Sequence, residues 1–196
     1  MITDLDKIGF QLIHSLHGNI SILDSLFVFI AGYSKIFMAL ILLIGILGII
    51  KRELSVTKEK NKALKTLFFN MALIGFLILV PILLSNLLRE LIMRPRPFVV
   101  FDIIPMIEQE IRPSLPSNHT TASFAIAGLF LTHMRSYFPY VGIIAALVGF
   151  SRIYTGIHFP LDIISGALLG LLPAITYLLV SRKTSNKTYQ ISKRFR

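Results

Sequence analysis

The chain has 196 residues and a net charge of +10, yet only 15% of its residues are charged, 54% are hydrophobic and the mean hydropathy is +0.73. A soluble domain usually carries about 25% charged residues. Because the charges are missing from long runs, the composition indicates a polytopic membrane protein and excludes a disordered or fibrous one. There is no cysteine, which excludes disulfides, zinc–thiolate sites, iron–sulfur clusters and a cysteine nucleophile.

The first 33 residues predict two short membrane-associated helices. Apolar residues with the spacing of an amphipathic helix occur at Leu5, Ile8, Leu12 and Leu16. The next apolar segment, Ile20–Ala31, is short and ends at Gly32. We expect an interfacial helix followed by a partial membrane helix, which leaves room for a sixth full span. No basic region precedes the apolar run, so no cleaved signal peptide is expected.

Five longer uncharged runs each predict a membrane span, and they are Ile36–Ile50, Thr66–Leu88, Thr120–Met134, Ser136–Ser151 and Ile163–Ser181. The second has 23 residues, enough to cross a hydrocarbon core of about 30 Å at about 1.5 Å per residue. A tight turn at Arg135 separates the third run from the fourth. The predicted fold is an all-α polytopic membrane helix bundle with five or six transmembrane helices. We divide it into an amino-terminal part (1–33), a transmembrane core (34–181) and a basic cytoplasmic tail (182–196).

The lysines and arginines predict the orientation of the bundle. If the five spans alternate, 13 of the 20 basic residues fall on one face: six in Lys51–Lys65, one at Arg135 and six after Ser181. The positive-inside rule makes that face cytoplasmic. The basic character of the chain therefore reflects topology and attraction to anionic lipids, and we expect no nucleic-acid partner.

Five arginines fall on the opposite face, at Arg89, Arg94, Arg96, Arg112 and Arg152. Arginines at the end of a span often only extend their guanidinium groups to the interface, and this remains one interpretation. The positive-inside rule disfavours it, however, and Pro95 and Pro97 are expected to end the helix, so that the guanidinium groups can converge in a loop.

Two further segments on that face carry histidines. Pro116 and Ser117 indicate a helix start, with Asn118 able to take a positive φ, and a helix amino terminus is an anion site. The alternative is an ordinary cap beside a surface histidine, His119. In the third segment, His158 precedes Asp162 by four residues, with Pro160 in the first helical turn. This spacing lets the carboxylate fix the imidazole tautomer, although a carboxylate at a helix start also simply stabilises the helix dipole.

Together, three or more arginines, a helix amino terminus and two histidines on one face predict a site for a multiply charged oxyanion, because arginine forks suit phosphate. One histidine paired with a carboxylate can attack phosphorus, and the other can protonate the leaving oxygen. No carboxylate cluster resembles a magnesium site, so this arrangement does not need a metal.

These three segments resemble the type 2 phosphatidic acid phosphatase superfamily, which contains membrane lipid phosphatases and soluble vanadium haloperoxidases. Its pattern is Lys-x6-Arg-Pro, then Pro-Ser-Gly-His, then Ser-Arg-x5-His-x3-Asp. Here the blocks read Arg89-x6-Arg96-Pro97, Pro116-Ser117-Asn118-His119 and Ser151-Arg152-x5-His158-x3-Asp162. Two residues depart from the pattern. Arg89 replaces lysine, and Asn118 replaces glycine, although asparagine tolerates the left-handed conformation.

The resemblance implies a role for each matching residue. His158 would be the nucleophile that forms a phosphohistidine, Asp162 would orient it, and His119 would be the general acid. The phosphoryl oxygens would be held by Arg89, Arg96 and Arg152, helped by Ser117 and the backbone of Asn118. No metal or cofactor is implied. The remaining histidines, His14, His17 and His133, are expected to be structural.

The amino-terminal sequence 10–30 and the run Arg94–Phe98 resemble the bacitracin-resistance branch of undecaprenyl pyrophosphate phosphatases. That branch removes the terminal phosphate of undecaprenyl pyrophosphate on the outer face of the bacterial inner membrane, which recycles the lipid carrier for cell-wall synthesis. Alternatives with the same fold are a phosphatidylglycerophosphate, lipid A or broad-specificity lipid phosphate phosphatase. A small transporter or a non-enzymatic membrane protein is the alternative from another class.

Overall fold

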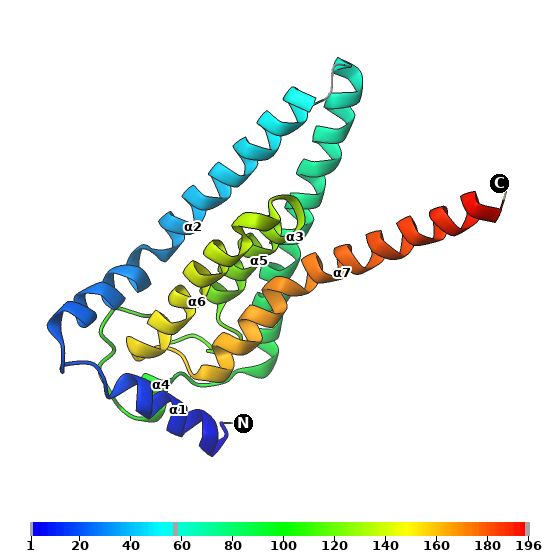
Figure 1. Cartoon of the computed structure of the whole chain (residues 1–196). Helices are drawn as coiled ribbons and strands as arrows, with labels where there is room; N and C mark the ends of the chain where they lie inside the picture. Colours follow the sequence, from blue (N-terminus) through cyan, green and yellow to red (C-terminus); the bar gives the residue numbers. More distant parts are fainter. Residues whose placement is uncertain (1, 57–58, 195–196) are drawn as a thin grey trace.

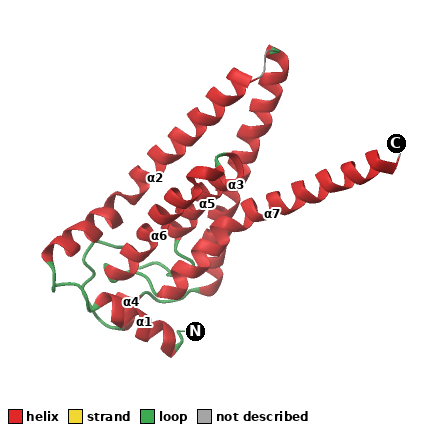
Figure 2. Cartoon of the chain, in the orientation of Figure 1, coloured by secondary structure: helices red, strands yellow, loops and turns green. Residues whose placement is uncertain are grey.

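Every regular element is a helix in the computed structural model, which describes residues 2–56 and 59–194, with side chains through residue 182 (Figure 2). The elements are α1 (Asp4–His14), α2 (Ser21–Val56), α3 (Lys60–Ile92), α4 (Pro97–Val100), α5 (Asn118–His133), the 3-10 helix η1 (Arg135–Tyr137), α6 (Phe138–Tyr154) and α7 (Pro160–Arg194). The all-α prediction is confirmed for this part of the chain. Because α7 extends to Arg194, the backbone through the predicted tail is helical as far as that residue.

Four stretches of the described chain are helical, long and apolar enough to cross a membrane: Ser21–Val56, Lys60–Val100, Arg135–Tyr154 and Pro160–Arg182. The fifth bundle helix, α5, has only 16 residues, and nine of them are buried. The protein is thus a multi-pass helical membrane protein with four helices of spanning length packed around α5, and the count of five or six spans stays a prediction.

The expected break at Gly32 does not occur, because α2 runs without interruption from Ser21 to Val56. A glycine inside a helix costs only about 1 kcal/mol relative to alanine, and the apolar residues on both sides of Gly32 continue the helix. The segment Lys51–Lys65, which lies between the first two predicted spans, is also largely helical. Lysine, arginine and glutamate are good helix formers, so α2 continues to Val56 and α3 begins at Lys60.

The centre of the bundle is the packing of α5 against α7, with α3 and α6 beside them. Small residues allow this close approach: a Cβ added to Gly170 of α7 would lie 2.5 Å from the carbonyl oxygen of Thr121 in α5. Membrane helices that pack through small residues bring their backbones together in this way. Residues at the start of α5 are therefore held rigidly against the start of α7.

One end of the bundle collects the loops that the sequence pointed to. The α3–α5 connection, the α6–α7 connection and α1 all lie there (Figure 1). Phe10 of α1 is 2% exposed and packs on Phe159, with ring centroids 5.6 Å apart. The opposite side of α1 is apolar and exposed, with Leu5 at 82% and Leu12 at 66%, as expected for a helix that lies in a membrane interface.

Candidate active site

A pocket of about 1090 Å³ opens at this end of the bundle. Six of the eight predicted site residues line it: Arg89, Arg96, Asn118, His119, Arg152 and His158. The other two, Ser117 and Asp162, are fully buried behind its wall. Helices α3, α5 and α6 and two loops supply the six lining residues, so residues separated by up to 69 positions meet in one pocket.

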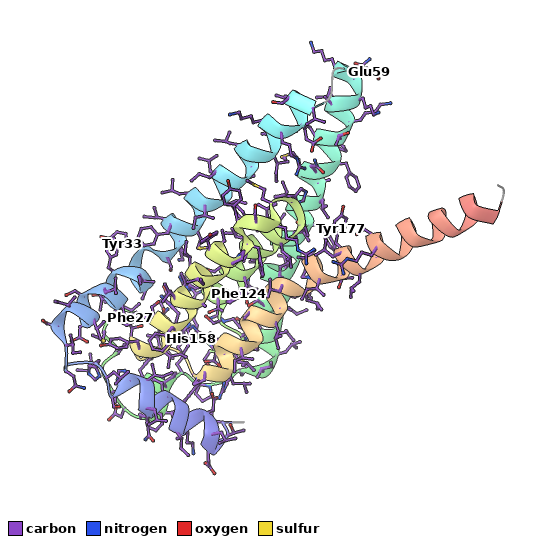
Figure 3. The ribbon with its side chains drawn as sticks, viewed as in Figure 1. Phe27, Tyr33, Glu59, Phe124, His158 and Tyr177 are labelled. Atoms are coloured by element: carbon purple, nitrogen blue, oxygen red, sulfur yellow. The ribbon has the colours of Figure 1, made fainter. Side chains whose placement is uncertain are left out.

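His158 lies in the loop between α6 and α7, at the loop end of the bundle (Figure 3). The turn before it needs Gly156, whose φ of +86° is unfavourable for other residues. Nδ1 of His158 lies 3.2 Å from Oδ2 of Asp162. Burial lowers the pKa of His158 to about 4, against the opposing influence of Asp162. The imidazole is therefore neutral at neutral pH, with Nδ1 engaged by the carboxylate and Nε2 free of any partner in the described chain.

The carboxylate of Asp162 makes further contacts besides the one with His158. The backbone N–H of Phe159 donates to its Oδ2 at 2.8 Å, and Nη1 of Arg94 donates to its Oδ1 at 2.5 Å. Arg94 also pairs with Asp6 of α1 and lies over the ring of Phe159, 4.7 Å from its centroid. The side chains of all three charged residues are at most 3% exposed. A carboxylate fixed in this way can orient His158 and stabilise its imidazolium.

The three pocket arginines are not neutralised by carboxylates within ion-pair distance in the described chain. Nε of Arg89 donates to the carbonyl of Pro113 at 3.0 Å, and Nε of Arg96 donates to that of Arg112 at 2.8 Å. Arg152 donates to the carbonyl of Ala31 at 3.0 Å and to Oε1 of Gln109 at 3.1 Å.

Two guanidinium nitrogens in this group, Nη1 of Arg96 and Nε of Arg152, are buried and have no hydrogen-bond partner among the described residues. Buried polar groups normally have partners. Unpaired nitrogens on several uncompensated cations therefore indicate a site for an anion with several oxygen atoms, such as a phosphoryl group.

The backbone of Asn118 does not have the conformation that was expected at a position where the family has glycine. It does not have a positive φ, because it is the first residue of α5. Its side chain accepts a hydrogen bond from Oγ of Ser85 and donates to Oδ1 of Asn86, which ties the start of α5 to α3. Glycine could not make these two contacts. The backbone N–H of Ser117 donates to the carbonyl of Asp162 at 3.0 Å.

Several contacts around the site were missed by the sequence analysis. Arg94 was placed on this face but given no role, and it pairs with both Asp162 and Asp6. Lys35, Gln109 and Glu108 line the pocket. Lys35 carried a signal, since it interrupts an otherwise uncharged stretch. No spacing in the sequence relates Asp6 to Arg94 or Asp162. Among the described residues, no three His, Asp or Glu side chains form a group suited to a metal ion.

Comparison with known proteins gives consistent results. The profile described as the PAP2 superfamily matches residues 66–185. The chain is 32% identical over 185 residues to the "Bacitracin transport permease protein BcrC" of Bacillus licheniformis, covering 93% of this chain and 84% of the relative. It is 30% identical over 164 residues to the "Undecaprenyl-diphosphatase BcrC" of Bacillus subtilis, covering 83% of this chain and 77% of that one.

The fold also has a solved counterpart. The crystal structure of LpxE from Aquifex aeolicus superposes with a TM-score of 0.67 and 24% sequence identity, covering 90% of this chain and 96% of that structure. At this level of identity the superposition concerns the fold alone.

Proposed function

The chain belongs to the PAP2 superfamily and is a membrane phosphatase of that family, and on this basis we propose that it hydrolyses undecaprenyl pyrophosphate to undecaprenyl phosphate and inorganic phosphate. The observation that carries the proposal is the pocket itself, in which Arg89, Arg96 and Arg152 surround the His158–Asp162 pair without carboxylate partners. This arrangement provides both a nucleophile and the counter-charge for a phosphoryl group.

In the first step, Nε2 of His158 attacks the terminal phosphorus of the substrate. Burial, together with the nearby cations, lowers the pKa of His119 to about 2 in the free pocket, so His119 gains its proton only when the negative charge of the bound diphosphate raises that pKa. The bond from phosphorus to the bridging oxygen breaks, and its electron pair leaves with the lipid monophosphate, to which the protonated His119 supplies a proton. Asp162 stabilises the positive charge that develops on His158. The three arginines stabilise the phosphoryl oxygens in the transition state.

In the second step, water attacks the phosphohistidine, and His119 accepts a proton from that water. The nitrogen–phosphorus bond breaks, its electron pair returns to His158, and inorganic phosphate leaves. The roles of His158, His119 and Asp162, and of Arg89, Arg96, Arg152, Ser117 and Asn118 as phosphate-binding groups, are part of the proposal. So is catalysis without a metal or cofactor.

The relative from Bacillus subtilis supports the choice of lipid, because its name is that of an undecaprenyl-diphosphatase and most of both chains align. A phosphatidylglycerophosphate, lipid A or broad-specificity phosphatase is the alternative, since the pocket residues contact only phosphate. The other relative's name describes transport. Transporters, however, place polar groups near the bilayer midplane at broken helices, whereas Arg89, His119 and Arg152 lie at the ends of α3, α5 and α6.

The proposal includes the membrane arrangement. Five or six helices cross the bacterial inner membrane, the pocket faces outward, and the carboxyl terminus is cytoplasmic. The support is the distribution of lysine and arginine: if the five predicted spans alternate, 13 of 20 basic residues fall on the side away from the pocket. An outward pocket suits recycling of a lipid carrier released at the outer face.

The test is phosphate release by the purified protein in detergent, with excess chelator, from undecaprenyl pyrophosphate, phosphatidylglycerophosphate, a lipid A phosphate and phosphatidic acid. We expect undecaprenyl pyrophosphate to give the highest kcat/KM, and a His158→Ala protein to release none. Preference for another lipid would assign one of the alternatives. Absence of release from the whole panel, by a protein that remains folded, would contradict the phosphatase activity.

A further inference from the structure

Lys35 is the only charged residue of α2 between Asp24 and Lys51. It is exposed, it has no hydrogen-bond or ion-pair partner among the described residues, and it lines the pocket together with Ala31 and Gly32. A lysine within a membrane helix is costly and is usually retained for binding or transport. An unpaired lysine at the wall of an anion pocket therefore needs a ligand to explain it.

Lys35 lines the same pocket as His119 and His158, and this shared pocket limits which parts of the substrate it can meet. Helix α2 forms one wall of the pocket, while α3 and α6 carry the arginines Arg89 and Arg152. Ile82 of α3 and Ala122 of α5 add an apolar lining to the pocket.

A lipid diphosphate brings two phosphate groups to this pocket. The terminal one must meet His158 and the arginines, because it is the group attacked. The lipid-linked one must lie beside His119, because it is the leaving group. We propose that Nζ of Lys35 binds this second, lipid-linked phosphate, and so forms a subsite that a lipid monophosphate leaves empty. This inference rests on the proposed function, and it gives a physical reason for the enzyme to prefer a lipid diphosphate over a lipid monophosphate.

The chemistry of the leaving group explains why a lysine is useful there. When the bridging bond of a diphosphate breaks, the leaving oxygen becomes part of a phosphate monoester, whose second pKa is about 6. Even after His119 supplies a proton, the lipid monophosphate keeps a negative charge, and an ammonium group stabilises that charge because it binds phosphate as a point charge. When a lipid monophosphate is cleaved, the leaving group is an alcohol, which needs a proton from His119 much more than it needs a nearby cation.

The subsite also lies outside the part of the chain that the family profile covers, since Lys35 precedes residue 66. The arginines and histidines that handle the attacked phosphate all lie within that part. The common pocket can thus serve many lipid phosphates, and α2 can select among them.

The experiment measures kcat/KM in detergent for a prenyl diphosphate and for the prenyl monophosphate of the same chain length. We expect the wild-type protein to favour the diphosphate, and Lys35→Gln to reduce the diphosphate-to-monophosphate ratio about tenfold or more, as for loss of a charge-assisted hydrogen bond. Lys35→Arg keeps the charge and should retain most of the preference. Lys51→Gln removes a lysine from the far end of the same helix and should leave the ratio unchanged.

The outcomes separate this inference from the proposed function. A wild-type protein that hydrolyses neither substrate would contradict the function. A wild-type protein that prefers the diphosphate, with the same ratio in folded Lys35→Gln, would overturn the subsite alone. A wild-type protein that hydrolyses both substrates without preferring the diphosphate would overturn the subsite as well, while leaving a lipid phosphatase. Melting temperatures of the variants in detergent establish that each is folded.

Discussion

Nη1 of Arg94 donates to Oδ1 of Asp162 at 2.5 Å, although the two residues are 68 positions apart and their side chains are 1% and 0% exposed. The same guanidinium pairs with Asp6 of α1, and Oδ1 of Asp6 accepts a hydrogen bond from the backbone N–H of Leu161 at 2.9 Å. The amino-terminal helix is therefore connected, through one arginine, to the carboxylate that contacts His158.

This connection predicts that Asp6 is a positioning residue. In Asp6→Asn, the charge of Arg94 is balanced by Asp162 alone, so the surroundings of His158 become more positive and its pKa falls further. We expect kcat to drop and the acid limb of the pH–kcat profile to move to lower pH. The free energy of unfolding should fall by about 1–3 kcal/mol, as for an impaired buried hydrogen bond, and the melting temperature should fall with it. Asp6→Glu should restore part of the activity.

Asp4→Asn is the matched control, because Asp4 lies in the same turn of α1 but its side chain is 93% exposed. It should change neither the acid limb nor kcat. If Asp6→Asn lowers stability while leaving the acid limb where it is in wild type, Asp6 supports the fold only.

His158 and Asp162 are expected to differ in the severity of their loss. His158→Ala removes the attacking nitrogen and should abolish both turnover and the trapped phosphoenzyme. Asp162→Asn leaves that nitrogen but spoils its orientation, so kcat should fall by a few powers of ten, roughly as in triads that lose their aspartate. Rapid acid quenching with labelled substrate measures the phosphoenzyme. His17→Ala is the control, because His17 lies at an exposed position of the amino-terminal segment, and it should behave as wild type. A phosphoenzyme in His158→Ala would rule out His158 as the nucleophile.

The lowered pKa of His158 predicts the acid side of the pH profile. The nucleophile must be neutral, and burial holds its pKa at about 4, against an ordinary value of 6.5. After correction for ionisation of the substrate, kcat/KM should stay high down to about pH 5 and fall as the pH drops through about 4. The free energy of unfolding also falls as the pH drops from 6.5 to 4, because in this range the unfolded chain binds a proton at this histidine and the folded chain does not. An acid limb at the ordinary histidine pKa would contradict a buried, neutral His158.

Arg89 tests how the pocket holds phosphate. Arg89→Ala removes one charge-assisted contact and should cost on the order of 2–4 kcal/mol in kcat/KM, by analogy with loss of an oxyanion donor. Arg89→Lys restores the residue usual at this position and should keep substantial activity, since the charge remains while the bidentate geometry is lost. Both are measured without added metal and with excess chelator. An Arg89→Ala enzyme as fast as wild type, or strict dependence on a divalent ion, would show that the counter-charge comes from elsewhere.

The orientation of the bundle can be tested with single cysteines, because the chain has none of its own. A cysteine at Asn61, at the start of α3, should react with a membrane-impermeant reagent only after the cell is opened. A cysteine at Ile104, which is 94% exposed in the α3–α5 connection, should react in intact cells. The reverse pattern would place the pocket on the cytoplasmic side.

The sequence alone was sufficient for the features that depend on short-range patterns. Long uncharged runs predicted an all-helical membrane protein, and the four-residue spacing of His158 and Asp162, with Pro160 between them, predicted their contact at the start of a helix. These inferences succeeded because hydrophobic periodicity, helix capping and i to i+4 spacing act over a few residues. The motif spacing also marked the six predicted site residues that line one pocket, which come from helix ends and from two loops.

Tertiary packing decided the rest. The continuity of α2 through Gly32 and the helical conformation of Asn118 depend on neighbours that the local sequence does not reveal, and Asn118 in particular is tied to Ser85 and Asn86 of another helix. The pairing of Asp6 with Arg94, and of Arg94 with Asp162, joins three distant segments. It exists only because α1 lies across the end of the bundle, where burial removes water and each charge must find its partner within the protein.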